Sequence, residues 1–179
     1  MEPTRSLIAV IKRAWDHAWV TTAHRPINRI AASRLPAILL LTGAPRGGKS
    51  TVARILAGCF DRAAHVDIDW VLHQLTVSGD PQVRLALQNT SALAANFHDE
   101  GIFAVIEGAV ADRESVDYLR AALAPRRLIV AVVGPQADAE HHQITVELSN
   151  ADIHIDSAGQ DPETTATLLL SLILRSASP

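Results

Sequence analysis

The 179-residue sequence predicts an α/β fold of three layers, in which helices cover both faces of a five-stranded parallel sheet. Two observations carry this prediction. Short apolar runs typical of buried strands recur along the chain, and segments with helical periodicity separate one run from the next. Strands that alternate with helices pair in parallel through right-handed crossovers. The chain is therefore predicted to form one α/β domain with an extension.

The extension comes first. Residues 6–22 place apolar side chains at helical spacing opposite a charged face, which predicts an amphipathic helix. Arg25-Pro26 and Leu35-Pro36 interrupt the segment after this helix, because a residue before proline is disfavoured in helices. We assign 1–35 to an N-terminal helical extension and 36–179 to the main domain. Because the helix is too apolar to be left in water, it would dock on its own domain or on a second copy, as a homodimer.

The main domain then alternates regularly. Five apolar runs predict the strands, at 37–41, 65–69, 103–106, 127–133 and 153–156. A helical pattern follows the first strand at 50–57, two follow the second, around 70–75 and from 80 to Gly101, one follows the third at 112–123, and one follows the fifth from 161 onward; none is predicted after the fourth strand. Asp80-Pro81 and Asp161-Pro162 suit helix starts, because Asp caps the free amides and Pro is accepted in the first turn.

Composition narrows the class of protein. Hydrophobic residues make up 48% and charged residues 20%, as in ordinary soluble domains, and no apolar run approaches the length of a membrane span. The single cysteine, Cys59, cannot form an intramolecular disulfide, which fits a cytoplasmic protein. Residues 1–60 carry a net charge of +7 and residues 61–179 carry −10. A phosphate site at residues 43–50 accounts for the basic first part, so we expect neither a nucleic-acid nor a membrane partner.

The strongest motif lies between the first strand and the helix after it. Gly43-Ala44-Pro45-Arg46-Gly47-Gly48-Lys49-Ser50 fits the phosphate-binding P-loop, with Thr51 next on the helix. Its glycines let backbone N–H groups turn around the β-phosphate, at a helix N-terminus that favours anions. Lys49 would bridge the β- and γ-phosphates and Ser50 would hold Mg²⁺. Arg46 could point to solvent or stabilise charge on the γ-phosphate.

Three carboxylates lie at the ends of later strands. Asp67 and Asp69 are two apart in the predicted second strand, so both would project from one face at its carboxyl end, where such sheets hold ligands. One could order Mg²⁺ while the other takes a proton from an acceptor hydroxyl; the alternative is a solvated strand end. Glu107 comes after the third strand at the place of a Walker B carboxylate that binds metal, or it is a capping acid.

Together these motifs resemble the small P-loop kinases, nearest to the chloramphenicol phosphotransferase-like group, with shikimate and gluconate kinases more distant. The resemblance covers residues 37–175 and implies the strand order 2-3-1-4-5. It also implies ATP- and Mg²⁺-dependent phosphorylation of a hydroxyl on a small molecule. In such kinases paired aspartates contact the metal and the acceptor hydroxyl, roles that the resemblance carries to Asp67 and Asp69.

One departure from these kinases concerns their lid, a mobile segment whose arginines close over the phosphates. Leu128 to Leu174 contains no Arg or Lys, and the segment from Pro135 to Ala151 is short. His141 and His142 are the only cationic possibility there, or they are ordinary solvent histidines. The missing charge could come from Arg46, Arg84, Arg113 or the arm of another subunit. Alternatively, the chain is a degenerate P-loop protein that binds nucleotide for regulation or assembly, or an NTPase coupled to a partner.

Overall fold

The structure, a computed structural model, describes residues 29–75, 80–135 and 139–176. The predicted helix over 6–22, and with it the proposed homodimer contact, lies outside the described residues. None of the helices in the described part is both long and apolar enough to cross a membrane.

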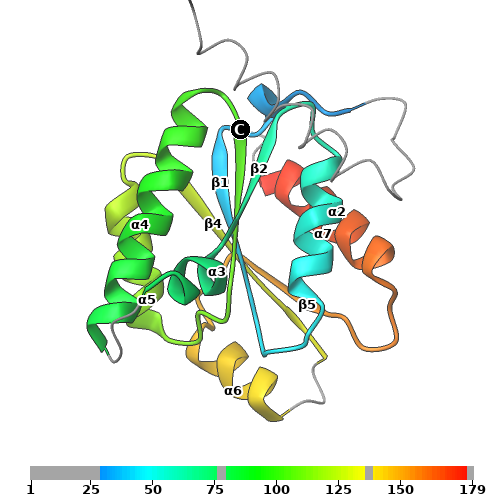
Figure 1. The fold of residues 1–179 in the computed structure, drawn as a ribbon. Helices are drawn as coiled ribbons and strands as arrows, with labels where there is room; N and C mark the ends of the chain where they lie inside the picture. Colours follow the sequence, from blue (N-terminus) through cyan, green and yellow to red (C-terminus); the bar gives the residue numbers. More distant parts are fainter. Residues whose placement is uncertain (1–28, 76–79, 136–138, 177–179) are drawn as a thin grey trace, which may run out of the picture.

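A five-stranded parallel sheet forms the middle of the molecule (Figure 1). Its order is β2-β3-β1-β4-β5, which confirms the predicted order. Each neighbouring pair of strands runs in parallel, so all the carboxyl ends meet at one edge. The strands are β1 (Ala37–Thr42), β2 (Ala63–Asp67), β3 (Phe103–Glu107), β4 (Arg127–Gly134) and β5 (Ile153–Asp156).

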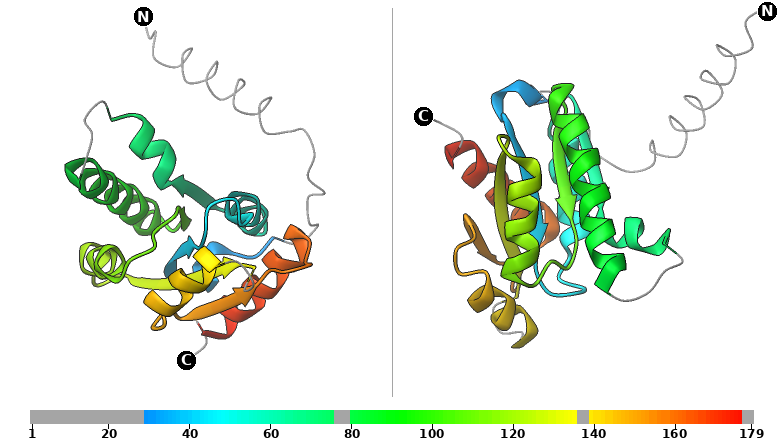
Figure 2. Two further views of the ribbon diagram at one scale, coloured as in Figure 1. Left: turned by 90° about the horizontal axis from the view of Figure 1, so that it is seen from below. Right: turned by 90° about the vertical axis from the view of Figure 1, so that its left-hand side faces the viewer.

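Helices cover both faces of this sheet, as Figures 1 and 2 show. On one face lie α2 (Lys49–Gly58) and α7 (Pro162–Ser176), and on the other α4 (Asp80–Asp99) and α5 (Arg113–Leu123). Two short helices, α3 (Ile68–His73) and α6 (Ala139–Glu147), lie towards the edge where β1 runs into the P-loop. This arrangement confirms the three-layer fold.

Each face of the sheet has its own apolar core. Because side chains alternate along a strand, Leu39 and Leu41 of β1 pack with α2 and α7, whereas Ile38 and Leu40 pack with α4 and α5. All four side chains are fully buried. The strand that leads into the P-loop is thus fixed from both sides.

The domain also includes residues just before Pro36. Ile30 pairs with Phe60, and the backbone N–H of Ala32 donates to Asp61 Oδ1 at 2.8 Å. The 3-10 helix η1 (Ala32–Arg34) comes next, and Leu35 is only 2% exposed. The end of the segment assigned to the extension therefore packs on the domain.

Candidate nucleotide and phosphoryl-transfer site

The turn from β1 into α2 has the backbone shape that its glycines suggest. Gly43 has a φ of +144°, and a Cβ built on it would lie 2.1 Å from the carbonyl oxygen of Val133 in β4. Gly48, the N-cap of α2, has a φ of +80°. Arg46 is the only non-glycine with a positive φ in the described part of the chain, and its side chain is exposed at the loop surface. Pro45 beside it is also exposed, whereas Ala44 is buried.

Lys49 and Ser50 are the first two residues of α2; the side chain of Lys49 is buried, whereas Ser50 is exposed. Lys49 is only 6% exposed, and its Nζ donates to the carbonyl oxygen of Ala44 at 2.8 Å, across the loop. Ser50 and Thr51 are exposed to solvent. The Ser50 hydroxyl donates to Glu107 Oε1 at 3.1 Å. The loop lysine and the helix-start hydroxyl thus lie at one site with a carboxylate from β3.

Glu107 is the last residue of β3 and is 4% exposed. Its second oxygen, Oε2, lies 3.5 Å from Nε2 of His65 on β2. Burial acts to raise the pKa of this carboxyl, but the His65 ring and the Ser50 hydroxyl, with the charge of Lys49, more than offset it, so the pKa of Glu107 is lowered. Glu107 is therefore held ionised beneath the start of α2.

His65 was not among the residues predicted from the sequence. The register of the sheet pairs Asp67 with Glu107 and His65 with Val105, so His65 and Glu107 are diagonal neighbours on adjacent strands. Its position two residues before Asp67 in a strand was a local signal that it would share the face of that residue.

The local structure predicted for the two aspartates is wrong. β2 ends at Asp67, and Asp69 lies in the first turn of α3 rather than in a strand. The reason is capping: Asp67 has extended backbone angles, and its Oδ1 accepts from the N–H of Trp70 at 3.1 Å, which starts a helix. The two carboxylates are thus not alternate residues on one face of a strand.

Asp69 nevertheless remains within electrostatic reach of the loop. Burial raises its pKa above the usual value of 3.8, and the charges of Asp67 and Glu107 raise it further. The charges of Lys49 and His73 act in the opposite direction. The carboxyl ends of β2 and β3 therefore gather acidic groups next to the P-loop lysine.

The segment between β4 and β5, where the resemblance to kinases implies a lid, contains the helix α6, which was not predicted from the sequence. Ile144 and Leu148 are 5% and 0% exposed and belong to the core on the α4 and α5 face. His142 is exposed. Arg113, at the start of α5, and Arg84, on α4, are exposed as well.

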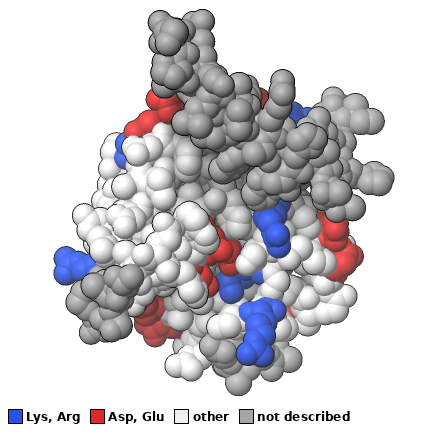
Figure 3. All heavy atoms as spheres, viewed as in Figure 1, with Lys and Arg blue, Asp and Glu red and all other residues white. Residues whose placement is uncertain are grey.

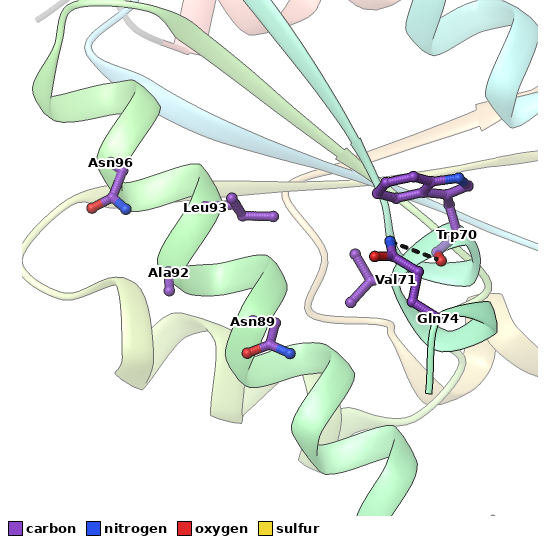
Figure 4. A pocket seen from close by; sticks show the side chains of 7 residues that line it. All are labelled: Trp70, Val71, Gln74, Asn89, Ala92, Leu93 and Asn96. Carbon is purple, nitrogen blue, oxygen red and sulfur yellow. Dashed lines mark hydrogen bonds between the residues drawn. The ribbon is translucent and has the colours of Figure 1, made fainter. Parts of the chain in front are cut away.

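A pocket of about 350 Å³ opens between α3 and α4, directly after Asp69 (Figure 4). Residues of α3 form one wall, and residues three and four apart along α4 form the other. The described lining residues are Trp70, Val71, Gln74, Asn89, Ala92, Leu93 and Asn96. The pocket thus adjoins the acidic end of β2.

No protein-family model matches the chain, and no curated protein matches its sequence. Solved structures do match its fold. APS kinase from Mycobacterium tuberculosis superposes with a TM-score of 0.62 at 18% identity, over 76% of this chain and 96% of that one. A gluconokinase from Sinorhizobium meliloti gives 0.58 at 16% identity, over 80% and 95%. A tunicamycin resistance protein from Deinococcus radiodurans gives 0.61 at 16% identity, over 76% and 95%. The fold of this chain is that of small P-loop kinases.

Proposed function

We propose that the protein is a phosphotransferase that uses ATP and Mg²⁺ to phosphorylate a hydroxyl group of a small molecule. The observation that carries the proposal is the meeting of five side chains at one edge of the sheet: the buried Lys49, Ser50 with its hydrogen bond to Glu107, Asp67 and Asp69. The similarity in fold to kinases supports it, and another structure of the M. tuberculosis APS kinase contains AMPPNP and APS.

In this proposal the loop from Gly43 to Thr51 binds the phosphates. Backbone N–H groups of the loop and the N-terminus of α2 would surround the β-phosphate, and Lys49 Nζ would contact the β- and γ-phosphates. Arg46, exposed on the same loop, would stabilise the charge on the transferred phosphoryl group.

The residues present also fit a magnesium ion. Besides its burial, the charges of Asp67 and Glu107 raise the pKa of Asp69, and a bound cation would relieve this repulsion among the carboxylates. The Ser50 hydroxyl, a further oxygen ligand, donates to Glu107. Among the described residues no group of three His, Cys, Asp or Glu side chains could hold a metal ion. Mg²⁺ takes most of its ligands from waters and phosphate oxygens, so one or two carboxylates with the Ser50 hydroxyl would be enough. Ser50, Asp67 and Glu107 would hold it, and the ion would neutralise phosphate charge.

Asp69 is the proposed general base. The acceptor oxygen would attack the γ-phosphorus while its proton moves to Asp69, and the bond from that phosphorus to the β–γ bridging oxygen would break to release ADP. A carboxyl whose pKa is raised by burial and by neighbouring acids is a better proton acceptor than an ordinary surface aspartate.

The test is ADP release by the purified full chain, measured across a collection of hydroxylated metabolites. With an acceptor found, Asp69→Asn should lower turnover by roughly 10²-fold or more with little change in nucleotide affinity. Asp67→Asn should instead raise the Mg²⁺ requirement, because Asn still caps α3 and only the charge is lost. Asp112→Asn is the matched control, since Asp112 caps α5 through Ser115 in the same way. Wild-type turnover in both Asp67 and Asp69 variants would refute these roles.

A second candidate is a degenerate P-loop protein that binds nucleotide without turnover. The observation in its favour is the absence of any Arg or Lys from Leu128 to Leu174, where lid arginines would stand. Charge stabilisers of this kind contribute about 10³–10⁵ in rate. Nucleotide binding by calorimetry, with no ADP release for any acceptor, would favour this candidate over the kinase.

A further inference from the structure

The ring of His65 carries a polar atom that the fold leaves without a hydrogen bond. Nε2 of this ring is buried, and no described residue forms a hydrogen bond with it. Oε2 of Glu107 lies 3.5 Å away, which is close enough for an electrostatic contact and longer than a well-formed hydrogen bond. Because buried side-chain nitrogens usually have a hydrogen-bond partner, this exception needs an explanation.

The surroundings of Glu107 supply that explanation. The residue is 4% exposed, and its Oε1 accepts from the Ser50 hydroxyl at 3.1 Å. Its other oxygen, Oε2, is the one near His65, which the register of β2 and β3 places diagonally across from it. A carboxylate only accepts hydrogen bonds, so a favourable contact requires a proton on Nε2. Ser50 and His65 thus address one carboxylate oxygen each.

Both partners of this contact belong to the sheet, which holds them at a fixed separation. His65 lies within β2 and Glu107 ends β3, and the two strands pair along the whole length of β2. Figure 3 shows acidic side chains exposed near α3, in the middle of the face drawn, with basic side chains next to them. Nε2 of His65, in contrast, is buried, so water does not compete with it for the carboxylate.

We infer that His65 is a positioning residue whose Nε2–H holds Oε2 of Glu107, so that Oε1 and the Ser50 hydroxyl stay aligned for Mg²⁺. The inference rests on the proposed function and adds to it a residue that touches neither the nucleotide nor the cation. Residues that orient a ligating carboxylate in this way typically contribute roughly 10–100-fold to metal affinity or activity.

The first measurement needs no metal. A neutral histidine ring carries its proton on either Nε2 or Nδ1, and ¹⁵N NMR distinguishes the two forms. At about pH 8, where histidine is ordinarily neutral, the signal of His65 should show a proton on Nε2. The spectrum of His65→Gln, which lacks this signal, assigns it. A bare Nε2 would overturn the inference, because such a nitrogen has nothing to donate to Glu107.

The second measurement is the affinity for Mn²⁺ in the presence of ADP, followed by electron paramagnetic resonance, since Mn²⁺ prefers the same oxygen ligands as Mg²⁺. His65→Leu should weaken Mn²⁺ binding by roughly tenfold or more and leave ADP binding without metal unchanged. His65→Gln should restore most of the affinity, because its amide is again a donor. No loss in His65→Leu, or an equal loss in both variants, would overturn the inference.

His154 provides the matched control. It stands in β5 two residues before Asp156, as His65 stands in β2 two residues before Asp67, but its side chain is exposed. His154→Leu should therefore leave Mn²⁺ affinity unchanged. A loss equal to that of His65→Leu would show that the effect does not depend on Glu107, which would overturn the inference.

A double-mutant cycle tests whether His65 acts through Glu107. In the background of Glu107→Gln, His65→Leu should weaken Mn²⁺ binding by less than about twofold, whereas independent effects would again give the full loss and overturn the inference.

The same variants separate this inference from the proposed function. Phosphate transfer to an acceptor, with an unchanged Mg²⁺ requirement in His65→Leu, would refute the role of His65 and leave the proposed function standing. Weakened Mn²⁺ binding in His65→Leu, restored in His65→Gln, in a protein that transfers phosphate to no acceptor would refute the proposed function and leave the role of His65 standing.

Discussion

A methyl group on Gly43 would collide with the backbone of β4, and this collision makes Gly43→Ala a sharp test of the loop geometry. The added Cβ would lie 2.1 Å from the Val133 carbonyl oxygen, an atom that cannot move without breaking the sheet. The φ of +144° adds strain for any residue with a side chain. Overpacking costs about 1–3 kcal/mol and a strained backbone about 1–3 kcal/mol, so the total is about 2–6 kcal/mol.

For a domain of this size, each kcal/mol lost from the free energy of unfolding lowers the melting temperature by about 2–4 °C, so Gly43→Ala should lower it by at least about 4 °C. It should also weaken nucleotide binding, because relief of the clash displaces the loop. Thermal melting followed by circular dichroism and calorimetry with Mg-ATP give the two measurements.

Two other glycines of the same region provide controls. Gly48 has a φ of +80° but open space around its Cβ, so Gly48→Ala should cost only about 1–2 kcal/mol. Gly58, at the end of α2, has open space and no positive φ, and Gly58→Ala should be neutral or stabilising by up to about 1 kcal/mol. The geometry argued for the loop would be wrong if Gly43→Ala melted at the same temperature as the wild type. It would also be wrong if the loss of stability did not decrease from Gly43→Ala through Gly48→Ala to Gly58→Ala.

Three further predictions concern single side chains. Lys49→Ala should abolish or greatly weaken Mg-nucleotide affinity by calorimetry while the circular dichroism spectrum stays that of the folded protein, and unchanged affinity would contradict the nucleotide site. Because the pKa of Asp69 is raised on folding, its ionised form opposes folding at pH values above that pKa. Asp69→Asn should therefore raise the melting temperature at pH 7, with a gain that shrinks as the pH falls through the raised pKa and is gone below the ordinary value of 3.8; a loss of stability at pH 7 would refute this sign. Asp112→Ala removes the cap of α5, where Oδ1 accepts from Ser115 N–H at 2.7 Å, and should cost about 1 kcal/mol in urea unfolding, whereas Asp112→Asn should not.

Most of the sheet could be predicted because its signals are local and strong. Five apolar runs of strand length, each bounded by turn residues or helical periodicity, placed the ends of β1, β3, β4 and β5 within one residue, whereas both ends of β2 were two residues off. The P-loop was equally local, since its glycines, lysine and serine occur in one continuous segment. The strand order came from a resemblance to kinases rather than from the pattern of residues.

The aspartate pair shows where local pattern failed. Val66-Asp67-Ile68-Asp69 alternates apolar and polar residues as a strand does, and the same four residues also fit a strand end followed by a capped helix start. Val66 and Ile68 are buried, at 5% and 4% exposure, which fits either structure, so burial does not decide between them. The helix start is instead selected by the cap from Trp70 N–H to Asp67 Oδ1, at the point where pairing with β3 ends. The contact of His65 with Glu107 was missed for another reason: the predicted strand order placed the third strand beside the second, but the register that makes these two residues diagonal neighbours was not predicted.

The helix α6 was missed although Ile144, within it, and Leu148, one residue past its end, have helical spacing. Only these two apolar side chains anchor it to the core among the described residues, and the surrounding residues are mostly polar, so the pattern is weak over one short segment.

The hydrogen bond from Lys49 to the Ala44 carbonyl, at 2.8 Å, holds the ammonium group across the loop before any nucleotide is present. Because an ammonium group has three N–H donors, a phosphate can bind to it without displacing this carbonyl. The lysine would therefore meet the phosphate already positioned, and less of the binding energy would be spent on ordering its long side chain. When the nucleotide leaves, the Lys49 ammonium, which is only 6% exposed, still donates to the Ala44 carbonyl. The buried charge therefore keeps an acceptor, and product release does not require the loop to unfold.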